Sequence, residues 1–243
     1  QEKPRAVVNG KGVMYVSIRE KVQSVVSTWG RDLVILAITV FLARLGQGLL
    51  RGVSTNFYID VVGLDGKQVL WLTGIREIPG LSLVVIAAFI SHWPLSRRAA
   101  AALLLMGLGY GLYALVNSYT ALLAVAVLGS LGFHNWMPLQ SSLGLALTKK
   151  EYSGRALGAL SSMGSLASIV GMGATALLAT TLPLRAFYVL GGIAICIGGL
   201  LILRIPASVG ECEEVQPRIL FKKRYWLYYL LVFFSGARKL VLG

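Results

Sequence analysis

Long apolar stretches alternate with short polar segments along most of the chain. A helix rises about 1.5 Å per residue, so about 20 apolar residues are needed to cross the hydrocarbon core of a bilayer. The pattern predicts six membrane-spanning helices, at 33–57, 68–90, 99–116, 120–147, 156–178 and 186–203. A seventh apolar run begins at Tyr225 and continues to Gly243, and we interpret it as the start of another helix.

The predicted fold is therefore all-α and polytopic, with a bundle of six helices over 32–204. A basic tail, 1–31, precedes the bundle, and apolar residues at helical spacing within it indicate either a helix on the membrane surface or a frayed end. A polar linker, 205–224, follows the bundle and leads to a truncated helix over 225–243. Because the chain starts at Gln1 rather than Met and stops within an apolar run, we expect it to be a fragment.

The composition supports a membrane protein. The chain is 56% hydrophobic and 14% charged, whereas a soluble domain is about 45–50% apolar and about 25% charged. The net charge of +13 would also suit a nucleic-acid partner, but the cations form short clusters between apolar runs rather than one basic face. We therefore expect the lipid bilayer, and no nucleic acid, as a partner.

The distribution of the cations predicts an orientation. If the N-terminus is cytoplasmic, the segments on that side hold 16 of the 23 Lys and Arg residues. The opposite side holds only Arg51, Lys67 and Arg185. Cytoplasmic loops of membrane proteins carry an excess of Lys and Arg. The sequence therefore predicts a multi-pass protein of the plasma membrane with its N-terminus in the cytoplasm.

Three features of the chain resemble the N-terminal half of a major facilitator superfamily transporter. They are the six helices followed by a basic linker, the loop Pro94-Leu-Ser-Arg-Arg98, and the helix entry Ser153-Gly-Arg-Ala-Leu-Gly158. In the loop only the terminal pair, Arg97 and Arg98, follows the family's motif, and Trp93 stands where the family has an acid. The resemblance implies a secondary active transporter of a small solute, driven by an ion gradient, in which two six-helix bundles rock about a central site.

The first predicted span contains a cation near its middle, Arg44. A charge at that depth costs about 2.5–3.5 kcal/mol on insertion scales, so it is functional by default. Gln47 and Arg51 lie on the same helical face as Arg44, because the spacing is i, i+3, i+7. We expect Arg44 and Gln47 to face a substrate cavity, and Arg51 to extend to the outer interface as an anchor.

The second predicted span carries adjacent charges, Arg76 and Glu77, followed by Pro79. Neighbours lie about 100° apart on a helix, so these two residues do not form a simple pair. We expect Glu77 to meet Arg44 across a helix interface or to carry a proton, with a structural ion-pair network as the alternative. Pro79 is expected to kink the helix.

The fourth predicted span contains the cluster His134, Asn135 and Trp136, shortly before Pro138. A proline in a helix bends it, and His can move protons while Trp can stack on a substrate or a cation. A ligand platform is one interpretation of this cluster. Hydrogen bonding between helices, which would satisfy His134 and Asn135 equally well, is the other.

Two further patterns concern packing and substrate charge. The span 156–178 is rich in Gly and Ser at three- and four-residue spacing, which predicts close contact with another helix. In the resembled fold the helix starting at Tyr225 corresponds to the one with Arg44, so Arg238 would be the counterpart of Arg44. Paired cations at one cavity favour an anionic substrate or a buried carboxylate partner.

We therefore expect a transporter of an unknown small molecule, with an anion as one candidate, coupled to a proton or another cation, and not an enzyme. No nucleotide-binding, zinc-protease or Cys-x-x-Cys motif occurs in the sequence, and we expect no catalytic residue, metal site or cofactor. An intramembrane enzyme with a His134 and Glu77 site stays open as an alternative, although the predicted boundaries can separate the two residues. A membrane scaffold would not need the polar residues inside the spans.

Overall fold

The structure is a computed structural model that describes residues 7–8, 14–15, 29–81, 83–210, 223–227 and 230–231. Gln1–Glu211 and Cys212–Gly243 form two compact units. In the tail, β1 (Val7–Val8) and β2 (Met14–Tyr15) are short antiparallel strands, with Val7 opposite Tyr15. The surface helix predicted for the tail starts from Met14, which lies in strand β2 instead, and the part of it between Tyr15 and Trp29 lies outside the described residues. Most of the predicted helix from Tyr225 also lies outside them.

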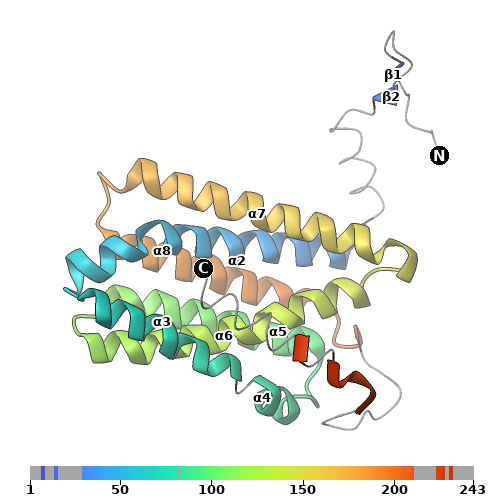
Figure 1. Ribbon diagram of the computed structural model, residues 1–243. Coiled ribbons are helices and arrows are strands. Elements are labelled where there is room, and N and C mark those ends of the chain that lie inside the picture. The colour runs from blue at the N-terminus through green and yellow to red at the C-terminus, as the bar shows by residue number, and fades with distance from the viewer. Residues whose placement is uncertain are drawn as a thin grey trace. The chain divides into compact units, whose positions relative to one another are not determined.

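The described part of the first unit beyond the tail is helical, which confirms the all-α prediction (Figure 1). Its elements are α2 (Arg31–Asn56), η1 (Phe57–Val61), α3 (Gly66–Leu81), α4 (Leu83–Phe89), α5 (Leu95–Gly111), η2 (Leu112–Leu115), α6 (Tyr119–Ala146), η3 (Lys150–Tyr152), α7 (Ser153–Leu178), α8 (Leu184–Leu201) and η4 (Ile202–Arg204). The second unit has η5 (Lys223–Tyr225). Among the described residues, five helical stretches are long and apolar enough to cross a membrane. The predicted span 68–90 is instead described as α3 and α4, on either side of residue 82.

Local sequence signals set several helix starts. The Asp65 carboxylate accepts a hydrogen bond from the Gln68 amide at 2.7 Å, and the Gln68 side chain accepts one from the Asp65 amide at 3.0 Å. This reciprocal capping box satisfies two free amides at the start of α3. Ser118 caps α6 through a bond of 3.3 Å from the Ala121 amide, and Pro94 and Pro183 stand immediately before α5 and α8.

The helices pack in an order that differs from their order in the chain. Helix α2 lies between α7 and α8, α5 lies between α8 and α6, and α3 packs on α6 (Figure 1). Helix α2 is thus flanked by the last two long helices of the unit, α7 and α8. Helix α3 contacts α6. This arrangement decides which polar side chains can meet.

The contact between α2 and α7 depends on glycine. A Cβ atom on Gly48 would lie 2.5 Å from the Ser168 carbonyl oxygen, and one on Gly171 would lie 2.5 Å from the Leu45 carbonyl oxygen. The Thr175 hydroxyl donates across the same contact to the Leu49 carbonyl at 3.1 Å. The close packing predicted for the small residues of 156–178 therefore occurs on this face. Gly158 and Gly173, on the same helix, face open space.

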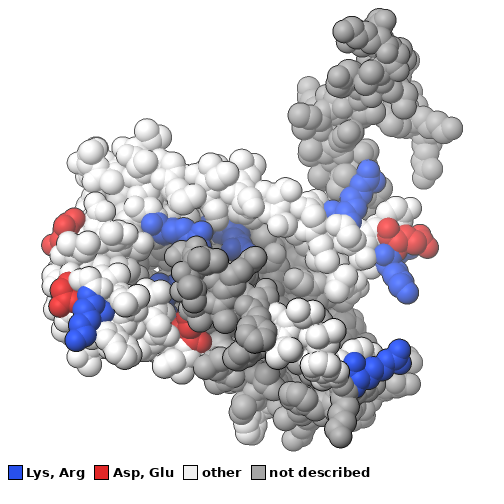
Figure 2. All heavy atoms as spheres, viewed as in Figure 1, with Lys and Arg blue, Asp and Glu red and all other residues white. Residues whose placement is uncertain are grey.

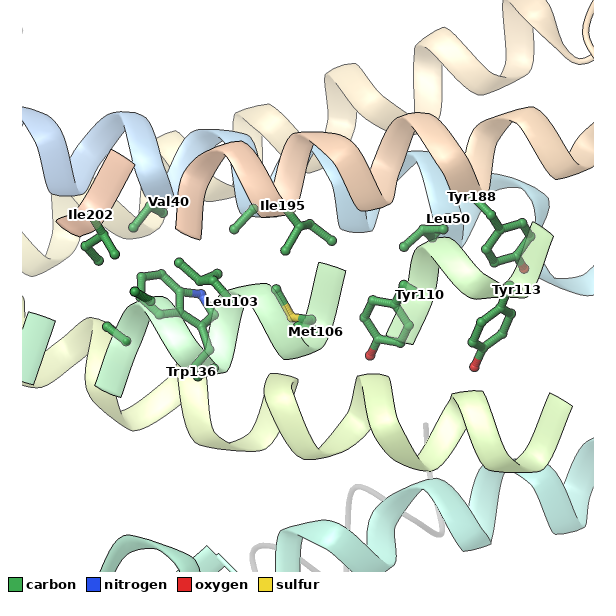
Figure 3. Packing of buried hydrophobic residues seen from close by; sticks show 14 of the residues in the cluster. Val40, Leu50, Leu103, Met106, Tyr110, Tyr113, Trp136, Tyr188, Ile195 and Ile202 are labelled. Atoms are coloured by element: carbon green, nitrogen blue, oxygen red, sulfur yellow. The ribbon is translucent and has the colours of Figure 1, made fainter. Parts of the chain in front are cut away.

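The hydrophobic core runs between α2, α8, α5 and α6 (Figure 3). Its largest fully buried side chains include Trp136, Phe187, Leu36, Leu103 and Met106. At one end of the core lies a group of aromatic rings. That end borders a polar hollow lined by tyrosines.

Candidate functional site

Two hollows open beside the described helices, and arginines line both. The first, called here the tyrosine pocket, has a volume of about 260 Å³. It is lined by Gln47, Leu50, Arg51, Ser54, Tyr58, Arg76, Tyr110, Tyr113, Phe133 and Tyr188. Residues from α2, η1, α3, α5, η2, α6 and α8 contribute to it. Its described lining contains two cations and no acidic side chain.

The second hollow, called here the serine pocket, has a volume of about 290 Å³. It is lined by Arg44, Arg51, Gln140, Leu160, Ser161, Gly164, Ser165, Ser168 and Ile169. Arg51 borders both pockets, so they lie on either side of this residue. Figure 2 shows Lys and Arg side chains partway along this face of the bundle as well as near its ends. The described lining of the serine pocket also lacks an acid.

Arg44 is half-buried and held by neutral partners. Its Nη1 donates to the Gln47 Oε1 at 3.3 Å, and Gln47 Nε2 lies 3.5 Å from the Met106 sulfur. Gly164 of α7 makes room for the arginine, because a Cβ there would lie 3.1 Å from Arg44 Cγ. The placement of Arg44 and Gln47 at the two hollows follows the spacing seen in the sequence.

Arg51 lies in the site, although the sequence favoured a role as an interface anchor. It is exposed in this chain and borders both pockets. Arg44 and Arg51 lie on one face of α2, and their charges repel one another. A negatively charged group between them would relieve this repulsion.

The aromatic rings of the tyrosine pocket form a stacked series. The rings of Tyr113 and Tyr188 stack with centroids 5.0 Å apart, and Tyr110 meets Tyr113 edge to face at 6.0 Å (Figure 3). Phe57 packs against Tyr188 at 4.5 Å. Aromatic pairs at such distances contribute about 0.5–1.5 kcal/mol beyond the area they bury. The rings therefore form one wall of the tyrosine pocket, in which the Tyr113 and Tyr188 hydroxyls are buried without a hydrogen-bond partner among the described residues.

Arg76 and Glu77 point to different partners, as their adjacency on a helix requires. Arg76 lines the tyrosine pocket, and its carbonyl accepts a short hydrogen bond from the Ser130 hydroxyl of α6. Glu77 Oε2 lies 3.5 Å from His134 Nε2. The expected contact between Glu77 and Arg44 is thus replaced by one between Glu77 and His134, because α3 packs on α6.

His134 is the residue of its cluster that reaches another helix. Its ring lies over Gly80, where a Cβ atom would be 3.1 Å from the ring. The His134 side chain is 18% exposed and that of Glu77 45% exposed. The structure therefore brings together Glu77 and His134, the two titratable groups named for the alternative intramembrane site. Pro79 lies inside α3 between Glu77 and Gly80.

The other two members of the cluster lie away from the pockets. Asn135 Nδ2 donates to the Leu131 carbonyl of its own helix at 2.8 Å. Trp136 is 1% exposed and packs in the core near Leu103 (Figure 3). The Trp136 ring thus belongs to the apolar core and lines neither hollow.

The remaining predicted residues lie elsewhere. Arg97 and Arg98 belong to the first turn of α5, where Arg97 is exposed and Arg98 half-buried. Arg238 lies outside the described residues. Among the described residues, no group of three or more His, Cys, Asp or Glu side chains is placed to hold a metal ion.

Sequence reasoning missed most of the tyrosine pocket. Tyr110 and Tyr113 have i, i+3 spacing and so share a face, which is a signal that could have been used. Tyr58 and Tyr188 come from distant parts of the chain, and only the packing of α2 and α8 brings them together. The sequence pattern does not indicate that a pocket is lined by Ser161, Ser165 and Gln140.

A second missed feature is a clamp made by Arg185 at the start of α8. Its guanidinium donates to the Ala114 carbonyl at 2.5 Å and to Asn117 Oδ1 at 2.8 Å. It also lies over the Phe57 ring, 5.9 Å from the centroid. The residue therefore ties α8 to the segment after α5 and to η1, next to the tyrosine pocket.

A bundle of membrane-length helices with a cationic, tyrosine-lined hollow in its wall is typical of membrane transporters. The family model described as Major Facilitator Superfamily matches residues 36–238, and the chain belongs to this superfamily. It is an integral, multi-pass membrane protein, and its family points to a transporter rather than an enzyme. A search of curated proteins found no match.

Solved structures of a peptide transporter POT share the fold. The chain matches crystal structures of that transporter in complex with sulfate, for the protein and for its E310Q mutant, with 15% sequence identity and a TM-score of 0.64. The E310Q mutant in complex with alafosfalin matches with 14% identity and a TM-score of 0.65. These matches cover 93–94% of this chain but 49–50% of the transporter. The chain thus spans about half the length of these proteins.

Proposed function

We propose that the chain forms one half of a secondary transporter that moves a small anionic solute across the membrane by alternating access. The observation that carries this proposal is the set of three arginines, Arg44, Arg51 and Arg76. They line two hollows that share Arg51 and whose described walls contain no acid. A charge inside a membrane protein is expensive unless it has a partner. An anionic substrate would supply that partner when it binds.

The polar groups around the arginines support recognition of a small oxyanion. Arginine offers several donors in a fixed fork that matches carboxylate and phosphate groups. Ser161, Ser165 and Ser168 stand beside Arg44, and Tyr58 and Tyr110 beside Arg76, so hydroxyl groups are available to both hollows. The sulfate and alafosfalin complexes of the similar transporter are in keeping with an anionic or peptide-like substrate here.

Alternating access requires a second bundle. In this fold class two six-helix bundles rock about a site between them, and the described helices supply one bundle. In this proposal 205–224 is the cytoplasmic linker and 225–243 begins the second bundle. Arg238 would then face the same cavity as Arg44.

Glu77 and His134 are the proposed groups for ion coupling. They lie 3.5 Å apart on α3 and α6, with Arg76 next in the chain and lining the tyrosine pocket. A carboxylate beside an imidazole can hold or release a proton as its surroundings change. We further propose that the protein lies in the plasma membrane with its N-terminus and the basic tail 1–31 in the cytoplasm, because most of the Lys and Arg residues fall on that side.

Replacement of Arg44 tests the function. The complete transporter would be reconstituted into liposomes as wild type, as Arg44→Ala and as the control Lys67→Ala, which removes an exposed cation outside both pockets. Uptake of labelled candidate anions would be measured together with the amount of correctly inserted protein. We expect Arg44→Ala to abolish transport, and Lys67→Ala to leave it near wild type.

The expected loss has a physical scale. A hydrogen bond to a charged group contributes about 1.5–3 kcal/mol, which corresponds to about tenfold or more in affinity. Unchanged anion transport by inserted Arg44→Ala protein would show that this arginine does not face the substrate. Transport of cations but not anions by the wild type would contradict the proposed substrate class.

A further inference from the structure

A third cavity lies apart from the two hollows, at the end of the bundle where α2 begins. Its volume is about 520 Å³, which is larger than either the tyrosine or the serine pocket. Figure 1 shows the start of α2 beside the turn that joins α6 to α7. The cavity is formed between these segments, and none of its lining residues belongs to the proposed substrate site.

The chemistry of this cavity changes from one wall to the other. Leu33, Leu147 and Ala156 form an apolar part, and Lys149 and Arg155 add two cations. Leu33 and Ala156 are buried, whereas Lys149 and Arg155 are exposed and free to reach a ligand at the mouth. The described lining includes no acidic residue that would neutralise the two cations.

Two further features favour an anion with an apolar body. Thr148 lines this cavity, and its Oγ1 atom is buried and has no hydrogen-bond partner among the described residues. Trp29 and Tyr152 border the cavity, and such rings settle at the level of lipid headgroups.

We infer that this cavity, named here the headgroup pocket, binds the phosphate of an anionic phospholipid. Lys149, Arg155 and the Thr148 hydroxyl would donate to the phosphate oxygens. The apolar wall and the two aromatic rings would contact the glycerol and the upper part of the acyl chains. In the orientation predicted from the basic loops, this end of the bundle faces the cytoplasmic leaflet, whose anionic lipids attract basic segments.

The test compares three ligands on the full-length protein in a neutral detergent. Short-chain phosphatidylglycerol, phosphatidylcholine of the same chain length and inorganic phosphate would each be titrated into the protein by calorimetry. We expect phosphatidylglycerol to bind most tightly. Equal binding of phosphatidylcholine would overturn the preference for an anionic lipid, and equal binding of inorganic phosphate would overturn the lipid as the source of the phosphate.

Matched variants connect the binding to the pocket. Lys149→Gln with Arg155→Gln is expected to weaken phosphatidylglycerol binding by about tenfold or more, from the loss of charge-assisted hydrogen bonds. The control, Lys150→Gln with Arg204→Gln, removes the same charge from two exposed residues outside the headgroup pocket and is expected to bind like wild type. An equal loss in the control would show general attraction to a basic surface and would overturn the inference.

A charge-conserving variant distinguishes the loss of the two charges from misfolding of the protein. Lys149→Arg with Arg155→Lys keeps both cations and is expected to retain the preference for phosphatidylglycerol. If this variant and the glutamine variant lost binding equally while the protein stayed monodisperse, the two side chains would matter for shape rather than charge. That result would also contradict the inference. Transport of a solute is not needed for any of these measurements, so they do not depend on the proposed function.

Discussion

Glu77 and His134 lie 3.5 Å apart, from the carboxylate Oε2 to the imidazole Nε2, on two helices that are not neighbours in the chain. The contact exists because α3 packs on α6, and because Gly80 leaves room for the imidazole one turn from Glu77. It is an ion pair whenever His134 carries a proton. Because these two titratable groups are in contact beside a cationic pocket, we propose that they couple proton movement to solute movement.

Replacement of Glu77 by Gln should separate coupled from uncoupled transport. We expect Glu77→Gln to exchange solute across the membrane but not to accumulate it against its gradient, because the variant lacks the carboxylate that we propose as a coupling group. Counterflow and pH-driven uptake in liposomes would measure the two activities. Glu151→Gln, which removes an exposed loop carboxylate, is the control. Wild-type accumulation by Glu77→Gln would leave the pair with a structural role only.

Enlarging Gly171 should disrupt the contact between α2 and α7. A side chain there would meet the Leu45 carbonyl oxygen at 2.5 Å, so the helices would have to separate. We expect Gly171→Val to destabilise the protein by about 1–3 kcal/mol, the cost of overpacking. Gly173→Val is the matched control, since no atom lies within 4 Å of the added Cβ. Denaturant unfolding in detergent would measure the difference, and equal effects of the two variants would argue against the close contact.

Removing the Arg185 clamp should loosen the end of the bundle next to the tyrosine pocket. The side chain makes two hydrogen bonds, to the Ala114 carbonyl and to Asn117, and lies over Phe57. We expect Arg185→Gln to lower the free energy of unfolding by about 2 kcal/mol, within the range for bonds to a charged group. Thermal unfolding would detect this as a lower Tm relative to Lys67→Gln. No change in Tm would show that water replaces these contacts at little cost.

The core position of Trp136 leads to a prediction that separates packing from ligand binding. Truncation to Ala should cost about 3–5 kcal/mol, as for other large buried aromatic side chains. Trp136→Phe should keep substrate affinity, because the ring lies in the core and not in either hollow. Unfolding measurements and substrate titrations on the same preparations would test both statements. A large loss of affinity in a stable Trp136→Phe protein would return this residue to the site.

Much of the helical part of the fold could be predicted from the sequence. Spans of apolar residues and their flanking turns placed most helix ends within a few residues, and the Asp65-Gly66 turn signal lies where α3 begins. The predicted span 68–90 corresponds to α3 and α4, which lie on either side of residue 82, and Pro79 lies inside α3.

The site was predictable only in part. The cost of a charge inside a membrane identified Arg44, and helical spacing added Gln47. The sequence offered both Arg44 and His134 as neighbours of Glu77. It could not decide between them, because the contact depends on which helices touch, and hydropathy contains no information on that. Trp136 shows the same limit, because the residues next to a tryptophan in the sequence do not determine whether its ring faces a cavity or the core.

The close contact between α2 and α7 restricts how these two helices can move relative to each other. With Gly48 and Gly171 bringing backbone against backbone, and the Thr175 hydroxyl bonded across the contact, one helix cannot slide along the other without steric collision. In the proposed transporter this contact would hold the arginines of α2 and the serines of α7 at a fixed spacing. The serine pocket would then keep its width and select solutes by size.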